Sequence, residues 1–447
     1  MSTALQGRYL FAALVFVLLW APLPIGSNRF WALWLLIGTV FLLAACCCLQ
    51  LARGRLTVTP ALRKSLWPLA LLVLVQIWVL IQLLPGPLQT RDVWATTNSL
   101  FEGLAYTTVF ALTLLLVDSR DRIRTLCFAL VLSGAFQAAY GSFMTLSGLE
   151  YGFFYKKDAY VGLATGTFFA RPHLAGYLVL CLAAGVGLLL ADMEKHPAQN
   201  WREFQRRVVN TMLGPKLRMR LLLAVMVIGL VLTRSRMGNA AFFTGLISMG
   251  FLALLLQRRV TRNALLLFGS LLLIDALILG NWFGFEKVVE RIEQTSTASE
   301  TRDDVSADAY RIFKDHWVAG TGAGSFYSQF PAYRSTDAGP GKWYHAHNDL
   351  IELPSEYGVV GYTPMVLFVL TSAWAAITVQ RRGKSRLQKA MGLTGSMAIV
   401  WLVMSSSVDF NMHIPATAVT FMAVMGIVWA SLYMKQTRAA KVDRNSK

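Results

Sequence analysis

The sequence has little with which to build a soluble or disulfide-bonded domain. Only five of its 447 residues are cysteines, and Cys46, Cys47 and Cys48 are consecutive within an apolar stretch. Adjacent helical cysteines point in different directions, which argues against a disulfide scaffold and a cysteine metal site. Charged residues form only 15% of the chain against 55% hydrophobic residues, and the mean hydropathy is +0.50. A soluble domain could not bury so much apolar surface, so the composition indicates a membrane protein.

Long apolar runs recur along the chain. About 20 residues of helix cross the hydrocarbon core, and helices satisfy their own backbone groups in lipid. We therefore predict an all-α polytopic membrane protein with about twelve transmembrane helices, forming one membrane domain over residues 1–447. The first run lacks a convincing signal-peptide cleavage site and is kept as a helix. The predicted helices cover residues 9–25, 30–51, 66–84, 100–117, 123–146, 173–191, 217–233, 237–256, 264–281, 359–379, 390–408 and 416–434.

Acidic residues are also few: 24 Asp and Glu stand against 42 Lys and Arg, a net charge of +18. The distribution of this charge argues against a nucleic-acid partner. Twelve spans put both termini and alternate loops on one side, and these segments with their flanks carry 28 of the 42 basic residues. The positive-inside rule makes that side cytoplasmic. We expect a multi-pass bacterial inner-membrane protein with both termini cytoplasmic, whose basic segment 192–220 faces solvent or lipid headgroups.

The longest predicted loop covers residues 282–358 and would face the periplasm. Residues 307–317 have helical spacing, and the glycine-rich turn Gly320–Gly324 follows. A long loop of this kind is typical of a lid or a binding platform. Asp275, inside the predicted ninth helix, has two interpretations: a functional carboxylate or the partner of a buried base.

Several arginines lie on the side that the topology disfavours. Arg234 and Arg236 occupy the short connection between the seventh and eighth predicted helices, and Arg171 begins the sixth. Such cations either reach into the headgroup layer or bind anions. Arg302 and Arg311 stand among aspartates in the large loop, where a solvated ion-pair network is an alternative to a ligand site.

The segment from Trp343 to Tyr362 is the richest in reactive groups. An extended chain would point His345 and His347 to one face, whereas a helix starting near Asn348 would leave His347 at its mouth. Pro354 would limit or kink that helix, and Gly358 and Gly361 would allow close contact with a neighbouring helix. Near neutral pH a histidine can take a proton from a hydroxyl. A zinc site is the rival interpretation, but no cysteine or ordered carboxylate set completes it.

These groups could together serve glycosyl transfer from a lipid diphosphate, a reaction that the residues identify only with the motif resemblance described below. Planar guanidinium groups bind diphosphate oxygens in pairs. A polyprenyl diphosphate would keep its tail in lipid and its diphosphate at the level of the arginines. A histidine could then deprotonate the incoming hydroxyl. Asp409, at the outer end of the eleventh predicted helix, could orient an imidazole or a guanidinium.

Several motifs resemble the O-antigen ligase and polymerase superfamily. His347 precedes Gly358 by the eleven positions usual there, and Ser235-Arg236-Met237-Gly238 resembles a Ser-Arg-Gly element with one residue inserted. Arg302 stands before Gly320-Thr321-Gly322 as the family's loop arginine precedes its Gly-x-Gly turn, with His316 just ahead of the turn. Residues 166–177 resemble the family's glycine- and asparagine-rich start of a helix, although Arg171 and His173 replace asparagines.

This resemblance implies a C-type glycosyltransferase-like membrane fold and an enzyme that uses no metal, cofactor or nucleotide sugar. It implies that undecaprenyl-diphosphate-linked glycan is joined, with inversion, to a lipid A–core sugar on the periplasmic face. His347 would be the base or acceptor activator, and Arg236 and Arg302 would bind the donor diphosphate. An O-antigen polymerase and a protein O-oligosaccharyltransferase remain alternatives, and a lipid-linked glycan transporter is a more distant one. Substrate-binding roles are predicted for Arg171, Arg234, Arg311, His345, Asn348 and Asp409.

Overall fold

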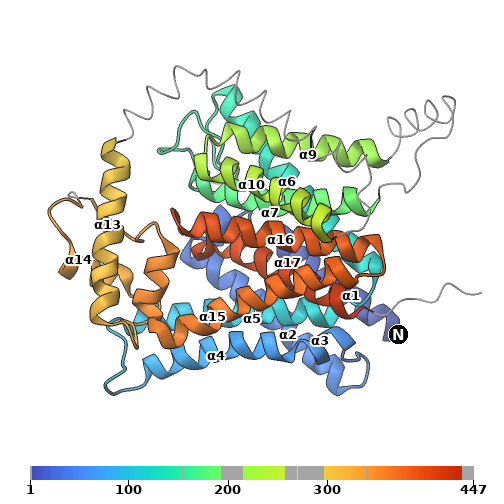
Figure 1. Ribbon diagram of the computed structural model, residues 1–447, viewed down its shortest axis with the longest axis horizontal. Helices are drawn as coiled ribbons and strands as arrows, with labels where there is room; N and C mark the ends of the chain where they lie inside the picture. The colour runs from blue at the N-terminus through green and yellow to red at the C-terminus, as the bar shows by residue number, and fades with distance from the viewer. Residues whose placement is uncertain are drawn as a thin grey trace, which may run out of the picture.

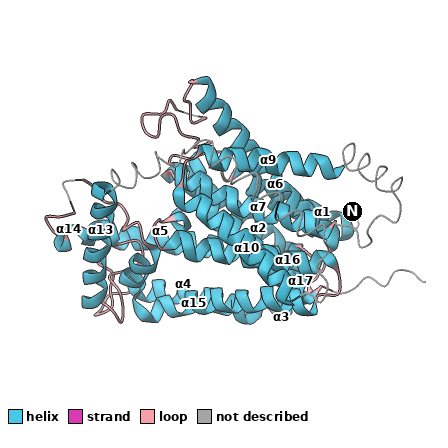
Figure 2. Cartoon of the chain, turned by 45° about the horizontal axis from the view of Figure 1, so that its top comes forward, coloured by secondary structure: helices cyan, strands magenta, loops and turns pink. Residues whose placement is uncertain are grey.

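The computed structural model describes residues 3–153, 155–192, 215–256, 269, 296–338 and 341–434. Within these residues the regular elements are helices, apart from one isolated bridge between Tyr151 and Lys156. The prediction of an all-α fold is therefore confirmed (Figures 1 and 2). The helices at least 18 residues long are α1 (Thr3–Trp20), α2 (Phe30–Ala52), α4 (Leu66–Leu83), α5 (Val93–Leu116), α6 (Arg120–Ser147), α7 (Arg171–Ala191), α9 (Pro215–Leu232), α10 (Arg236–Leu256), α13 (Ser296–Asp315), α15 (Asp349–Arg382), α16 (Arg386–Ser406) and α17 (Pro415–Tyr433).

Nine helices of the described residues are long and apolar enough to cross a membrane, which supports a polytopic protein. They are α2, α4, α5, α6, α7, α10, α15, α16 and α17. The predicted spans 9–25 and 217–233 correspond to α1 and α9. The predicted span 264–281, with Asp275, lies outside the described residues. The total of twelve spans therefore stays a prediction.

Polar caps extend two helices beyond the apolar spans predicted for them, and for α15 this agrees with the predicted alternative of a helix starting near Asn348. Helix α5 begins at Val93 rather than at residue 100, and the Asp92 side chain accepts a hydrogen bond from Ala95 N at 2.9 Å. Helix α15 begins at Asp349 rather than at residue 359, and Asn348 accepts from Leu350 N at 3.1 Å. A side-chain acceptor satisfies a free N–H at a helix start without adding hydropathy.

Helices α7 and α17 form the centre of the bundle, since 94% and 89% of their apolar windows are buried. Glycines let neighbours approach α7 closely. A Cβ at Gly187 would collide with the Thr394 hydroxyl of α16, and one at Gly185 would collide with Leu223 of α9. Small residues at such crossings allow close van der Waals packing in a membrane. The centre of the bundle is thus filled by packed helices.

The bundle has two chemically different ends. At one end the Lys64 ammonium of the short helix α3 (Pro60–Lys64) lies over the Tyr433 ring, at 5.6 Å, and Gln388 donates to Ser431 O at 3.0 Å. This basic end includes Arg53, Arg55, Arg63, Lys64, Arg120, Arg122, Arg381, Arg382, Lys384 and Arg386. The opposite end holds α13 and the short helix α14 (Phe326–Tyr333), on the left in Figure 1. We call it the site end.

Helix α15 is kinked at Gly358, where φ is 61° and ψ is 176°. A Cβ there would collide with the Val318 carbonyl oxygen, so this conformation and this contact both require glycine. The kink was predicted at Pro354, which instead lies inside the first helical segment. Gly358 and Gly361 were both predicted to contact a neighbouring helix. Gly361 does so, since it packs against Trp78 of α4, whereas Gly358 contacts the loop after α13.

Candidate active site

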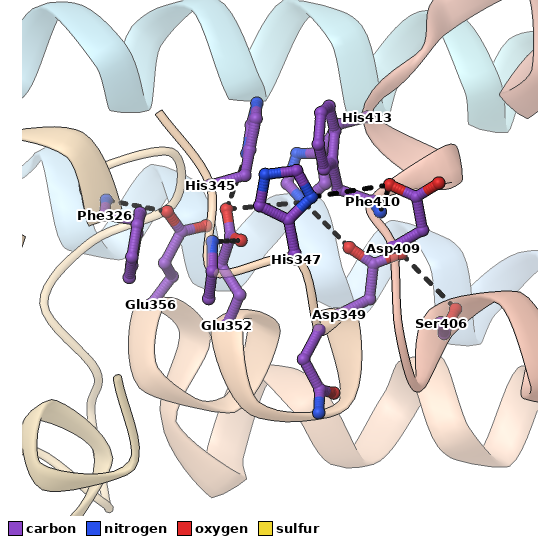
Figure 3. Close-up of polar contacts among 12 residues, drawn as sticks. Phe326, His345, His347, Asp349, Glu352, Glu356, Ser406, Asp409, Phe410 and His413 are labelled. Atoms are coloured by element: carbon purple, nitrogen blue, oxygen red, sulfur yellow. Dashed lines mark hydrogen bonds and ion pairs between the residues drawn. The ribbon is translucent and has the colours of Figure 1, made fainter. Parts of the chain in front are cut away.

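Four segments meet at the site end around the ring of Phe410, and Figure 3 labels residues from the loop before α15, from α15 and from the connection after α16. They are the start of α7, the loop before α15, the first turns of α15, and the connection from α16 to the short 3₁₀ helix η2 (Asn411–His413). The ring centroid of Phe410 lies 4.3 Å from that of His345, 4.8 Å from that of His347 and 5.0 Å from that of His173. Residues far apart in the sequence thus share one centre.

His347 stands at the mouth of α15, as one of the two predicted arrangements required. Its φ of 54° is unusual for a residue with a Cβ, and such backbone conformations gather at functional sites. Its Nδ1 lies 3.7 Å from Asp409 Oδ1, beyond direct hydrogen-bond distance. The ring is 21% exposed and the Asp409 side chain 8% exposed. The carboxylate can therefore attract a proton-bearing imidazole while the ring stays accessible.

Asp409 is held as an anion. Burial alone would raise the pKa of this carboxyl group, but the nearby His347 and His173 and the backbone N–H of Phe410 lower it below 3.8. The Phe410 N–H donates to Asp409 Oδ1 at 3.0 Å. The predicted orienting role of Asp409 thus has a geometric basis, toward an imidazole rather than a guanidinium.

His345 has a different environment because Glu352 fixes its loop. Its Nδ1 lies 2.7 Å from Glu352 Oε1, and the Ala346 N–H donates to Oε2 at 2.6 Å. Glu352 is 1% exposed. Both carboxylate oxygens thus bind the segment that leads to His347. This pairing makes His345 part of the support of the loop, and its predicted contact with substrate stays a prediction.

His413 completes a second buried pair. Its Nε2 lies 3.3 Å from Asp349 Oδ1 and 3.7 Å from Glu352 Oε1. Burial alone would lower the pKa of His413, but contact with Asp349 and the negative charge of Glu352 outweigh it and raise the pKa to about 10. Ser406 donates to Asp349 Oδ2 at 3.3 Å. A charged His413 therefore ties η2 to the first turn of α15.

Three of these side chains could hold a metal ion. Donor atoms of His345, Glu352 and His413 lie within 4.8 Å of one another. The sequence analysis found no carboxylate to complete a histidine site, and the structure supplies Glu352. The same contacts are explained by charge pairing between the histidines and the carboxylates, so the cluster needs no ion to account for it. The absence of a metal from the reaction stays a prediction.

The predicted arginines come together at two helix starts. Arg171 begins α7 and Arg236 begins α10, while Arg234 has a φ of 49° in the connection before α10. Arg171 Nη1 donates to the Arg234 carbonyl at 3.3 Å. The charges of Arg234, Arg236 and Arg302 lie close enough to act on Arg171. Helix N-termini and clustered guanidinium groups both favour an anion such as diphosphate.

His173 links this arginine cluster to the histidines. It lies in the first turn of α7, two positions after Arg171, and is 4% exposed. The charges of Asp409, His345 and His347 are close enough to act on its ring. Among the described residues, no hydrogen-bond partner reaches its Nε2. His173 thus lies beside the histidines, on the helix that Arg171 begins.

Two predicted substrate-binding residues have structural contacts instead. Arg311 pairs with the buried Asp308 at 3.1 Å, as the ion-pair alternative expected. Asn348 caps α15. Their substrate-binding roles stay predictions.

Sequence reasoning missed the acidic face of α15. Asp349, Glu352 and Glu356 are spaced by three and four residues, so they share one helical face directly after the His-x-His segment. Glu356 accepts from Gly324 N at 2.9 Å and Phe326 N at 2.8 Å, which fixes the glycine-rich turn. This spacing was a readable signal, whereas the pairing with His413 depends on the fold.

Residues 221–366 match the family model described as O-antigen ligase. The match covers Arg234, Arg236, Arg302 and His347, while Arg171 and Asp409 lie outside it. A search of curated proteins finds no match. The fold is that of a helical, polytopic membrane protein. The matched segment, residues 221–366, is similar to the O-antigen ligase superfamily and supports a relationship of the chain to that superfamily.

Proposed function

We propose that the protein is an O-antigen ligase. It transfers a glycan from undecaprenyl diphosphate to a sugar hydroxyl of lipid A–core. The observation that carries the proposal is the position of the pair His347 and Asp409 beside His173 of α7, the helix that Arg171 of the arginine cluster (Arg171, Arg234, Arg236 and Arg302) begins. Anion binding and proton transfer are the two tasks of this reaction, and we assign them to the arginine cluster and to His347 with Asp409.

The proposed step balances as follows. The acceptor oxygen forms a bond to the anomeric carbon as the bond from that carbon to the donor diphosphate breaks. His347 takes the proton of the acceptor hydroxyl, and Asp409 stabilises the imidazolium that forms. The leaving diphosphate takes the bonding electrons, and the arginine cluster neutralises the charge that it gains. Attack opposite the leaving group inverts the anomeric carbon.

The two ends of the bundle support the proposed orientation. The basic end fits the cytoplasmic face of the inner membrane, which leaves both termini there and the site end in the periplasm. The donor's prenyl tail would lie in the bilayer beside the described spans, with its diphosphate at the arginine cluster. A C-type glycosyltransferase-like fold and a single membrane domain remain part of this proposal.

The test is transfer by purified protein in liposomes, supplied with undecaprenyl-diphosphate glycan and rough lipopolysaccharide. Glycosylated lipid A–core supports the ligase. Longer glycans on the carrier indicate a polymerase, and glycan on added pilin indicates protein glycosylation. No bond formation but movement of donor across the bilayer indicates a transporter.

The proposed contact between Arg236 and the diphosphate is tested by a separate substitution. Arg236→Lys keeps the charge but lacks the planar fork, so we expect transfer to fall by roughly tenfold or more. Lys342→Arg, an exposed change of the same kind in the loop before the histidines, is the control. Full activity of Arg236→Lys would remove the paired contact from the proposal.

A further inference from the structure

A second pocket opens at the site end between the α4–α5 connection and the loop after α13. Its volume is about 230 Å³. Polar groups line it from both sides, with Gln89 and Arg91 on one wall and Asp315 and His316 on the other. Trp317 also lines it and is 57% exposed. The proposed mechanism uses none of these residues.

Hydrogen bonds hold the walls of this pocket in place without a ligand. The Arg91 N–H donates to Thr321 O at 3.0 Å, and Gln82 Nε2 donates to Ala319 O at 2.8 Å. The Tyr333 hydroxyl donates to Asp315 Oδ2 at 2.9 Å and lies 3.5 Å from His316 Nε2. Preformed walls of this kind lower the cost of binding because little has to be ordered.

The pocket has one charge of each sign, from Arg91 and Asp315, so neither a simple anion nor a simple cation is favoured. Arg91 lies close enough to Tyr333 for its charge to act on the phenol that binds Asp315. A guanidinium and a carboxylate thus face the same space. Together with Gln89 and His316 they offer both donors and acceptors. This combination suits a neutral ligand with several hydroxyl groups better than a phosphate.

Trp317 supplies the second half of such a site. A sugar ring has hydroxyl groups around its edge and C–H groups on its faces, so it binds where polar groups adjoin an aromatic face. Amphipathic aromatic rings with one wet face are common in recognition sites. An exposed Trp317 beside the polar wall provides that arrangement.

The pocket is connected to the active site through α15. The Val359 N–H donates to Trp317 O at 2.8 Å, and the Thr321 N–H donates to Ser355 O at 3.0 Å. The seven steps along α15 from Asp349 to Glu356 give a rise of about 10 Å. A glycan with one sugar at His347 can therefore place another sugar farther along the same helix.

We propose that this pocket binds a neutral sugar ring of the glycan substrates, at a distance from the bond that is made. This inference rests on the proposed function for the identity of the saccharide. Two sources supply the same chemistry: the donor glycan and the core oligosaccharide of the acceptor.

The test measures binding of two free saccharides to full-length protein in nanodiscs. The probes are core oligosaccharide released from rough lipopolysaccharide of the native host and glycan released from its lipid carrier. Trp317→Ala is compared with Tyr310→Ala, a matched control because Tyr310 is a 46% exposed aromatic residue of α13 that does not line the pocket. Trp317→Phe keeps an aromatic face and controls for folding.

We expect wild type and Tyr310→Ala to bind one saccharide equally, Trp317→Phe to bind almost as well, and Trp317→Ala to bind on the order of tenfold more weakly. The saccharide that loses affinity identifies the source. If wild type shows no saturable binding, or if Trp317→Ala binds as tightly as wild type, the proposal that this pocket binds a sugar is wrong. Transfer is measured in parallel. Trp317-dependent binding without transfer refutes the proposed function alone, and transfer without Trp317-dependent binding refutes the pocket alone.

Discussion

Asp409→Asn removes one charge from the active site and leaves its shape almost unchanged. The asparagine oxygen can still accept from the Phe410 N–H, which donates to Asp409 Oδ1 at 3.0 Å. The change therefore isolates the attraction between the carboxylate and His347, whose atoms lie 3.7 Å apart. In the proposed reaction this attraction grows when His347 takes the proton, so its loss should lower kcat more than it changes KM.

The size of the effect follows from the distance and the burial. Two unit charges about 4 Å apart attract by about 4 kcal/mol at an effective dielectric constant of about 20. The His347 ring is 21% exposed, so solvent screens part of this attraction. We expect a loss of about 1.5–3 kcal/mol of transition-state stabilisation, which is roughly a ten- to hundred-fold fall in kcat.

The assay is initial-rate transfer in liposomes with both substrates varied. Asp337→Asn, which removes an exposed aspartate of the same end, is the matched control and should behave as wild type. The pKa of Asp409 lies below its ordinary value of 3.8, so its charge is present above that pH and is lost only as the pH falls through the lowered pKa. The rates are therefore compared at about pH 7, where the carboxylate of wild type is fully charged. A kcat for Asp409→Asn within about twofold of wild type would refute the role of the pair.

Three further predictions concern the support of the site. His413 has a pKa raised to about 10, so the stability that its charge contributes is full below about pH 6.5 and is lost as the pH rises toward 10. Thermal unfolding in detergent should show that wild type is more stable than His413→Gln at pH 6, and that this difference disappears by pH 10. A difference that does not depend on pH would contradict this prediction. Gly358→Ala should abolish well-folded protein in size-exclusion chromatography because its Cβ would collide with Val318. Gly54→Ala, with a similar φ of 65° but open space around it, should lower the stability by only about 1 kcal/mol. Equal yields of the two variants would contradict the requirement for glycine at the kink of α15. Dialysis against EDTA should leave transfer unchanged, and activity that falls and returns with added Zn²⁺ would show that His345, Glu352 and His413 hold an ion.

Hydropathy was sufficient to predict most of the fold. Apolar runs located eleven helices of the described residues because lipid tolerates no other backbone arrangement. It could not predict the starts of α5 and α15, because Asp92 and Asn348 extend these helices through short polar caps. Nor could it separate a kink at Pro354 from one at Gly358, which depends on the contact with Val318.

The site was predictable where residues stood out against their surroundings. Arg171, Arg234 and Arg236 were singled out because the predicted topology put these cations on the disfavoured side, and the structure brings Arg171 into contact with Arg234. His347 was found beside Asn348 at a helix mouth. His413 and Glu352 were missed as a pair because their contact joins η2 to α15, which only the folded chain brings together.

The most direct test of the central claim compares wild type with His347→Ala in purified liposomes that contain undecaprenyl-diphosphate glycan and rough lipopolysaccharide, with donor binding measured on the same samples. We predict glycosylated lipid A–core from wild type. In the variant we predict unchanged donor binding and a rate at least about a hundredfold lower, because His347 accepts the proton and the arginine cluster holds the diphosphate. Transfer by His347→Ala at the wild-type rate would contradict the account.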